Sequence, residues 1–145
     1  MNENIELVQY IYKSSEMGVY SSENILNSIN GKENKIIKDV ENILKEYEKY
    51  KKESKKIIKK NKYELVNNSI KTKIGSMMGI KMEVTNDNSD SAIAHLMIEG
   101  LTMGVVDIES KINRFDKEVD KKIMKLAKDY LNFHNNYIKL LKKYL

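Results

Sequence analysis

Cysteine, proline and tryptophan are absent from the 145 residues of this chain, and arginine occurs once, at Arg114. The absence of cysteine excludes disulfide bonds, thiol catalysis and thiolate metal sites. The absence of proline favours long helices, because proline interrupts them more strongly than any other residue. No apolar run reaches the length of a membrane span, and no secretory signal pattern opens the chain. We therefore expect a cytoplasmic protein without a membrane span.

The net charge of the chain limits the kinds of partner it is expected to bind, and its length limits the number of domains. The formal net charge of +5 comes from lysine rather than from arginine. Proteins that read phosphates or bases rely on the planar guanidinium of arginine, so nucleic-acid binding is not expected. With 41% hydrophobic and 32% charged residues in a length typical of one domain, the sequence predicts a single helical-bundle domain over residues 1–145.

The most apolar segment is 92–109, and its spacing predicts a helix that is buried on more than one side. Most of its apolar residues share one narrow arc of a helical wheel. A second apolar surface is formed by Leu96, Met103 and Val106. A helix of this kind belongs inside a bundle. Gly100 and Gly104 each cost roughly 1 kcal/mol relative to alanine, and the close approach of a neighbouring helix would compensate.

Helical periodicity extends over nearly the whole chain. The predicted helices cover residues 3–29, 33–61, 63–86, 90–115 and 121–144. Asn30-Gly31 suits the end of the first helix, because glycine adopts the left-handed conformation found there. The apolar face of the first helix is small in its middle, at Ser15, Gly18 and Ser22, so a neighbour is expected to pack closely there. The helix over 63–86 is expected to cross between two hairpins, with a kink at its glycines.

The chain contains a weak internal duplication. Met17-Gly18-Val19 recurs as Met103-Gly104-Val105, 86 positions later. A shift of one more residue aligns the second predicted helix with the last one and pairs Tyr47 with His134. The alternative is a chance alignment of two amphipathic hairpins. Two antiparallel hairpins joined by a long crossover correspond to the ferritin-like version of the four-helix bundle.

The sequence also resembles a group of small, uncharacterised bacterial proteins that are usually placed with ferritin-like bundles. The resemblance is carried by residues 17–18, 79–82, 91–94 and 100–107, which lie in both predicted hairpins. None of these segments is a catalytic signature. The resemblance therefore implies a fold, an all-α ferritin-like four-helix bundle with an additional crossover helix, far more than it implies an activity.

The di-iron chemistry of ferritin-like bundles requires a Glu-x-x-His motif on each of two helices. This chain has two histidines, His95 and His134, and the residues three positions before them are Ala92 and Leu131. The di-iron pattern is therefore absent from both halves of the sequence. No cofactor is predicted, and ferroxidase or oxygenase chemistry is not expected.

A reduced metal site is kept as an alternative. If the hairpins are antiparallel, Glu16, Glu99 and His134 fall close to one layer of the bundle, and these three residues are the candidate metal ligands. The competing interpretation makes His134 a hydrogen-bonded core residue and the two glutamates boundary side chains that face solvent or lysine. His95 and Glu99, four residues apart, could chelate a metal ion, but no third ligand accompanies them.

A run of eight lysines lies between Lys49 and Lys62. Such a run suggests binding to a polyanion or to a membrane surface. It also fits a solvated helix end, and Glu53, Ile57 and Ile58 interrupt it.

Three functional hypotheses follow from these features. The leading one is a non-enzymatic cytosolic protein with a structural or partner-binding role. Leu96, Met103 and Met17 lie outside the main apolar faces, which indicates a homodimer, an unidentified protein partner, or burial under the crossover helix. The alternatives are a metal-binding bundle with a degenerate site and a polyanion-binding protein that uses its lysine-rich helix.

Overall fold

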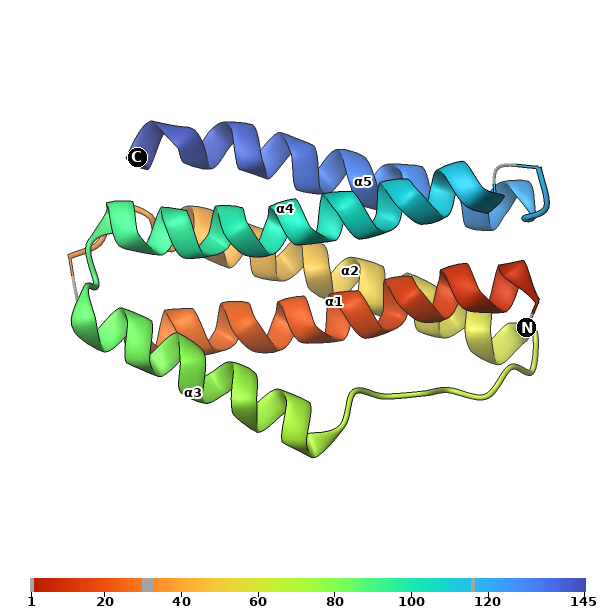
Figure 1. Cartoon of the computed structure of the whole chain (residues 1–145), viewed down its shortest axis with the longest axis horizontal. Helices are drawn as coiled ribbons and strands as arrows, with labels where there is room; N and C mark the ends of the chain where they lie inside the picture. The colour runs from red at the N-terminus through yellow and green to blue at the C-terminus, as the bar shows by residue number, and fades with distance from the viewer. Residues whose placement is uncertain (1, 30–32, 116) are drawn as a thin grey trace.

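A computed structural model describes residues 2–29, 33–115 and 117–145, without the side chain of Ile74. Over these residues the chain forms five α-helices and a terminal 3-10 turn, as Figure 1 shows. The bounds are α1 Glu3–Ser28, α2 Ile37–Lys60, α3 Ile70–Asn86, α4 Asp90–Phe115, α5 Lys121–Leu141 and η1 Lys142–Tyr144. The prediction of an all-helical protein is confirmed, whereas the predicted turn at Asn30-Gly31 lies outside the described residues.

Short polar side chains begin three of the helices. The side chain of Asn2 accepts a hydrogen bond from a backbone N–H in the first turn of α1, and Ser69 does the same for α3. Ser89 accepts the N–H of Ala92 at 3.2 Å at the start of α4. These contacts satisfy backbone donors that have no partner within the helix.

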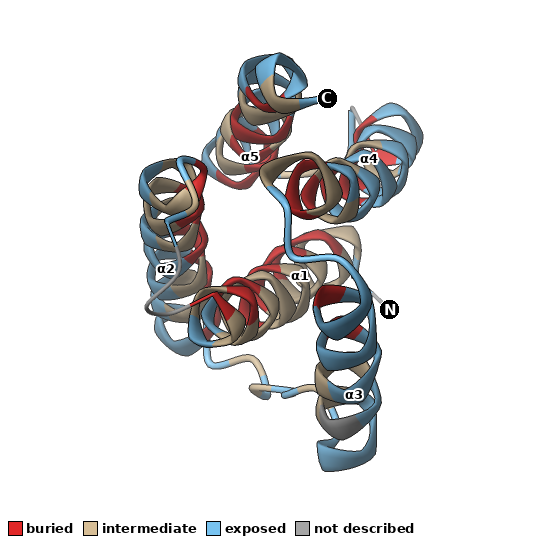
Figure 2. Cartoon of the chain, turned by 90° about the vertical axis from the view of Figure 1, so that its left-hand side faces the viewer, coloured by how far each residue is buried: buried red, intermediate tan, exposed pale blue. Residues whose placement is uncertain are grey.

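Two helical hairpins make up the body of the molecule, because α1 packs along α2 and α4 packs along α5. In Figure 1, α1 and α5 run from right to left, whereas α2 and α4 run from left to right. Seen end-on in Figure 2, these four helices form a ring with buried residues on their inward faces. The third helix, α3, lies outside the ring and packs on α1.

The core consists of aliphatic side chains that recur every three or four residues on each helix of the ring, the spacing that keeps them on one face. Fully buried examples are Leu7, Ile11 and Ile25 of α1, Val40, Ile43 and Ile58 of α2, Ile93 and Ile108 of α4, and Leu141 of α5. A cluster of aromatic rings joins α2 to α5. Its members are Tyr47, Tyr50, Tyr130, Phe133 and His134, and their ring centroids are 4.4 to 6.4 Å apart.

The predicted helix over 63–86 is wrong in its first part, because residues 63–69 are not helical and α3 begins at Ile70. We call residues 63–69 the strap. Lys62 has a positive φ of 57°, which turns the chain away from the end of α2. Asn67 and Asn68 then hydrogen bond to side chains of α1. Asparagine side chains that bond outside a helix compete with helix formation.

Two other boundaries differ from the prediction. The second helix begins at Ile37 rather than at residue 33, because the carboxylate of Asp90 accepts hydrogen bonds from the backbone N–H groups of Lys35 and Ile36. These contacts fix the chain before α2 against the start of α4. The last α-helix ends at Leu141 and continues as the 3-10 turn η1.

The fourth helix departs from one sequence-based expectation. Among the helices of the described residues, α4 is long and apolar enough to cross a membrane by length and composition alone, so the statement that no segment reaches this limit was wrong. Core helices meet the same two criteria. Of its most apolar 18 residues, 33% are buried, which leaves apolar surface of α4 uncovered.

Candidate functional site

A groove with a volume of about 640 Å³ lies between α1 and α4, beside α3. We call it the central groove, and its volume falls in the range of sites that bind small molecules. The small residues that line it are Ser14, Gly18, Ser21, Ser22, Ser76, Gly100 and Gly104. The apolar side chains that line it include Met17, Ile25, Ile80, Leu96, Met97, Leu101 and Met103. Tyr47 and His134 reach it from α2 and α5 and form its floor.

Glycine allows an aromatic ring to approach the backbone on each side of the floor. A Cβ atom on Gly18 would lie 2.3 Å from Cδ1 of Tyr47, and a Cβ atom on Gly104 would lie 2.6 Å from Nε2 of His134. Neither contact is sterically acceptable, so both rings depend on the missing side chain. A Cβ atom on Gly100 would meet nothing within 4 Å, and this glycine leaves the wall of the groove open.

The orientation of His134 is fixed by one hydrogen bond. Its side chain is 1% exposed, and Nδ1 lies 2.8 Å from the backbone oxygen of Tyr130. A carbonyl oxygen can only accept a hydrogen bond, so Nδ1 carries the hydrogen. Burial lowers the pKa of His134 to about 4, against a smaller opposing effect of the Tyr130 carbonyl. The imidazole is therefore neutral at pH 7, and Nε2 holds a free electron pair.

Tyrosine hydroxyls surround the floor of the groove. Oη of Tyr130 and Oγ of Ser14 are 2.6 Å apart and link α5 to α1. Burial raises the pKa of Tyr10 to about 12, with Asp107 adding to this effect and a hydrogen bond to Ser14 opposing it. Burial also raises the pKa of the Tyr47 and Tyr130 hydroxyls. All three hydroxyls remain protonated at neutral pH and can donate hydrogen bonds.

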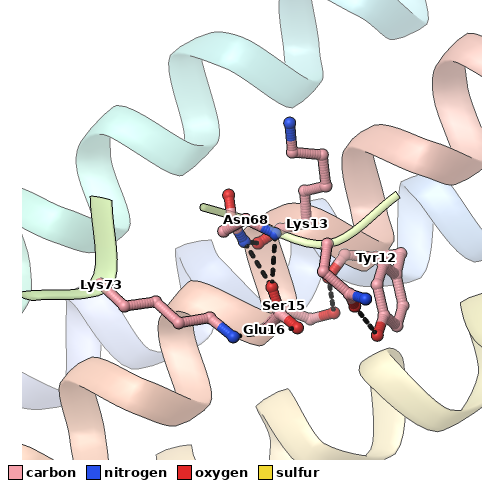
Figure 3. Close-up of polar contacts among 7 residues, drawn as sticks. Tyr12, Lys13, Ser15, Glu16, Asn68 and Lys73 are labelled. Atoms are coloured by element: carbon pink, nitrogen blue, oxygen red, sulfur yellow. Dashed lines mark hydrogen bonds and ion pairs between the residues drawn. The ribbon is translucent and has the colours of Figure 1, made fainter. Parts of the chain in front are cut away.

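The strap is fastened to α1 through a buried carboxylate, shown in Figure 3. Glu16 is 6% exposed, and its Oε1 accepts hydrogen bonds from the backbone N–H and the side-chain Nδ2 of Asn68, both at 2.8 Å. Nζ of Lys73, in the first turn of α3, lies 3.5 Å from Oε2. Asn68 also donates to the backbone oxygen of Lys13. One side chain of α1 thus holds both the strap and α3.

The carboxylate of Glu16 remains ionised in this setting. Burial acts to raise its pKa, but the two hydrogen bonds from Asn68 and the positive charges of Lys73 and Lys51 together outweigh this effect. The pKa of Glu16 is therefore lower than the ordinary value for a glutamate.

The three candidate metal ligands are not brought together as a ligand set. Glu16 is engaged by Asn68 and Lys73, Glu99 is exposed to solvent, and His134 is a hydrogen-bonded core residue in contact with Gly104. Within residues 2–29, 33–115 and 117–145, no three histidine or acidic side chains are close enough to hold one metal ion. The geometry gives the metal-binding alternative no support.

The lysine-rich end of α2 lies largely in solvent. Lys49, Lys52, Lys56, Lys59 and Lys60 are exposed, and Lys51 and Lys55 are half-buried. His95 on α4 is exposed as well. Exposed lysines are also typical of a solvated helix end, so their exposure does not identify a ligand.

Sequence reasoning did not find the central groove or the fastening of the strap. Leu96 and Met17, for which the sequence predicts a homodimer interface, a protein partner or burial under the crossover helix, line the groove. Met103 is 69% exposed, so α3 does not cover it. Two signals were present: the recurring Met-Gly-Val segments mark the groove walls, and Asn67-Asn68-Ser69 is rich in residues that interrupt helices.

No protein-family model, curated protein or solved structure matches this chain.

Proposed function

We propose that this chain is a non-enzymatic binding protein and that an apolar partner occupies the central groove. The observation that carries the proposal is the lining of the groove. Small and apolar side chains lead from the exposed Gly100 and Met103 down to two buried residues with polar groups, Tyr47 and His134. A mostly apolar concave surface with a few convergent polar groups is the usual form of a binding site.

The setting of His134 supports binding rather than acid–base catalysis. A general base is oriented by a third group and has a pKa near the working pH. The Tyr130 carbonyl orients the ring of His134 through Nδ1, but burial keeps the pKa of His134 at about 4, far below neutral pH. The neutral imidazole keeps one hydrogen, on Nδ1, and its Nε2 accepts a hydrogen bond without taking up a second proton at neutral pH.

The proposal includes a finer description of the fold, a ferritin-like bundle built from an internal repeat. It is supported by the crossover between α2 and α4, which run in the same direction. It is also supported by the match between two contacts, Gly18 with Tyr47 and Gly104 with His134, which are the pairs that the sequence alignment relates. In this description, the groove lies between the first helices of the two repeats.

A dye-binding experiment with two glycine variants tests the proposal. Nile red, an uncharged apolar dye, should bind the folded wild-type protein at one site. Gly100→Leu should abolish this binding, because Gly100 lines the groove and has open space around its Cα atom. Gly79→Leu is the matched control, since Gly79 is equally open but lies on the exposed face of α3, outside the groove.

Both substitutions replace a helical glycine and should leave the fold intact or stabilise it. Equal dye binding by all three proteins, or none by the wild type, would refute the groove as a binding site. Sedimentation velocity at the same micromolar concentration identifies the case in which the partner is a second copy of this chain.

A further inference from the structure

We propose that the occupant of the central groove is a small, uncharged aromatic molecule with one O–H or N–H group, which donates its hydrogen to Nε2 of His134. This inference rests on the proposed function and names the chemical class of the partner.

The acceptor is identified by geometry. Nδ1 of His134 is used by the Tyr130 carbonyl, and Nε2 has no hydrogen-bond partner among the described residues. The edge of the ring that carries Nε2 packs beside the backbone at Gly104, and both residues line the groove. Nε2 is not among the fully buried polar atoms without a partner, so it is within reach from the groove. A ligand that donates one hydrogen therefore replaces the water that would otherwise bond to this acceptor.

The charge of the ligand follows from the position of the ionised side chains. Lys13 and Asp107 line the groove, but Asp107 is exposed and Lys13 is half-buried, so both lie towards its rim. The floor is formed by the neutral side chains of Tyr47 and His134. A charged group there would be buried without a counter-ion, which is strongly unfavourable. The ligand is therefore uncharged where it meets the floor.

The preference for an aromatic ring comes from the walls. Tyr47 and His134 offer ring edges and faces, which favour a third ring in an edge-to-face arrangement. Met17, Met97 and Met103 line the same groove, and methionine sulfur makes favourable contacts with aromatic rings.

A pair of matched probes tests the hydrogen bond. 2-Naphthol donates one hydrogen, whereas 2-methoxynaphthalene has the same ring system and no donor. Because the chain contains no tryptophan, naphthalene fluorescence can be excited apart from the protein. The ratio of the two dissociation constants is measured for the wild type and for His134→Phe, which keeps a ring of similar size and removes the acceptor.

The preference for 2-naphthol should be about 3- to 10-fold larger in the wild type than in His134→Phe, the range for one net hydrogen bond. Equal ratios in the two proteins would overturn this inference alone, provided that Gly100→Leu still abolishes the binding of both probes. If Gly100→Leu binds both probes normally, the proposed function fails as well. Gly79→Leu should bind like the wild type.

A measurement on the wild-type protein covers the case in which His134→Phe does not fold. The chain has two histidines, so their imidazole nitrogen resonances can be assigned with a His95→Gln variant. 2-Naphthol should shift the Nε2 resonance of His134 towards the hydrogen-bonded range, and 2-methoxynaphthalene should not. The same response to both probes, or a response at His95 only, would contradict the inference.

Discussion

The α1–α2 hairpin and the α4–α5 hairpin have the same contact at their centres but carry different chemistry there. In the first, the backbone at Gly18 packs against the phenol ring of Tyr47, and in the second, the backbone at Gly104 packs against the imidazole of His134. The close approach needs only a flat ring. The ring itself decides whether the centre of a hairpin offers a hydroxyl group or a free nitrogen acceptor, so the packing and the chemistry are separable.

The two hairpins also differ on their outer faces. The strap and α3 cover α1 and are fastened by Glu16. Within the part of the chain that the structure describes, α4 has no such cover, and its Met103 and Val106 are 69% and 62% exposed. The central groove lies between the covered helix and the uncovered one. This asymmetry gives the groove one fixed wall, on α1, and one wall that a partner can reach from solvent, on α4.

The largest expected difference between the hairpins is in their response to acid. His134 stays neutral in the folded protein down to pH of about 4, whereas an unfolded histidine takes up a proton below about 6.5. The unfolded state therefore binds more protons in this interval, and stability falls as the pH decreases through it. The loss from this one residue should be on the order of 3 kcal/mol, from 1.36 kcal/mol per unit of pKa difference.

Urea unfolding followed by circular dichroism at several pH values between 7 and 4 measures this effect. The wild type should lose about 3 kcal/mol more than His134→Phe over the interval. Tyr47→Phe, the equivalent change in the other hairpin, should keep the wild-type pH dependence, because the raised pKa of Tyr47 lies far above this interval. If His134→Phe and the wild type have the same slope, His134 is not held neutral by burial.

The next largest effect concerns the contact between a glycine and a ring that both hairpins have at their centres. Gly18→Ala and Gly104→Ala should each destabilise the protein by about 1–3 kcal/mol, because the added methyl group collides with a ring held on both sides. Gly18→Ala should be the worse of the two, since its nearest contact is 2.3 Å rather than 2.6 Å.

Gly79→Ala serves as the control, and it should stabilise α3 by up to roughly 1 kcal/mol through helix propensity alone. Thermal and urea unfolding of the three variants provide the comparison. A destabilised Gly18→Ala beside a neutral Gly104→Ala would mean that the two hairpins do not share this packing.

The α-helices were predictable from the sequence because their apolar residues repeat at helical spacing, and each of these helices is 17 to 26 residues long. A helical pattern of that length depends on local backbone geometry and does not require contacts between distant parts of the chain. The strap was not predictable by this route. Its shape is fixed by Asn67 and Asn68, whose partners on α1 lie 52 to 55 positions earlier, and periodicity within a window carries no information about such distant polar contacts.

The candidate site shows the same limit. The sequence identified His134 and Glu16 as candidates because both are titratable residues on or near an apolar helix face, where such residues are uncommon. Whether two such side chains share a metal ion, however, depends on a few ångströms and on competing partners. Asn68 and Lys73 engage Glu16, and the Tyr130 carbonyl fixes His134. Neither competition is visible in the spacing of Glu16, Glu99 and His134.

The smallest expected effect tests the asymmetry of the outer faces. Glu16→Gln keeps an oxygen that can accept both hydrogen bonds from Asn68 but removes the charge that attracts Lys73, so stability should fall by about 1 kcal/mol. Because the pKa of Glu16 is lowered in the folded state, its contribution is present above the ordinary carboxyl pKa and lost as the pH falls through the folded value. The variant should lack this loss.

Hydrogen–deuterium exchange locates the change. In Glu16→Gln, the amides of the strap and of α3 should exchange faster at neutral pH, while those of α2 and α5 stay protected. The reason is that the strap and α3 can open locally while the ring of four helices stays folded. Glu23→Gln, an exposed change on the same helix, should leave exchange unaltered. Faster exchange throughout the molecule would show that the cover of α1 belongs to the cooperative core. In that case the two walls of the groove would be equally fixed, and a partner would have to displace core packing to reach His134.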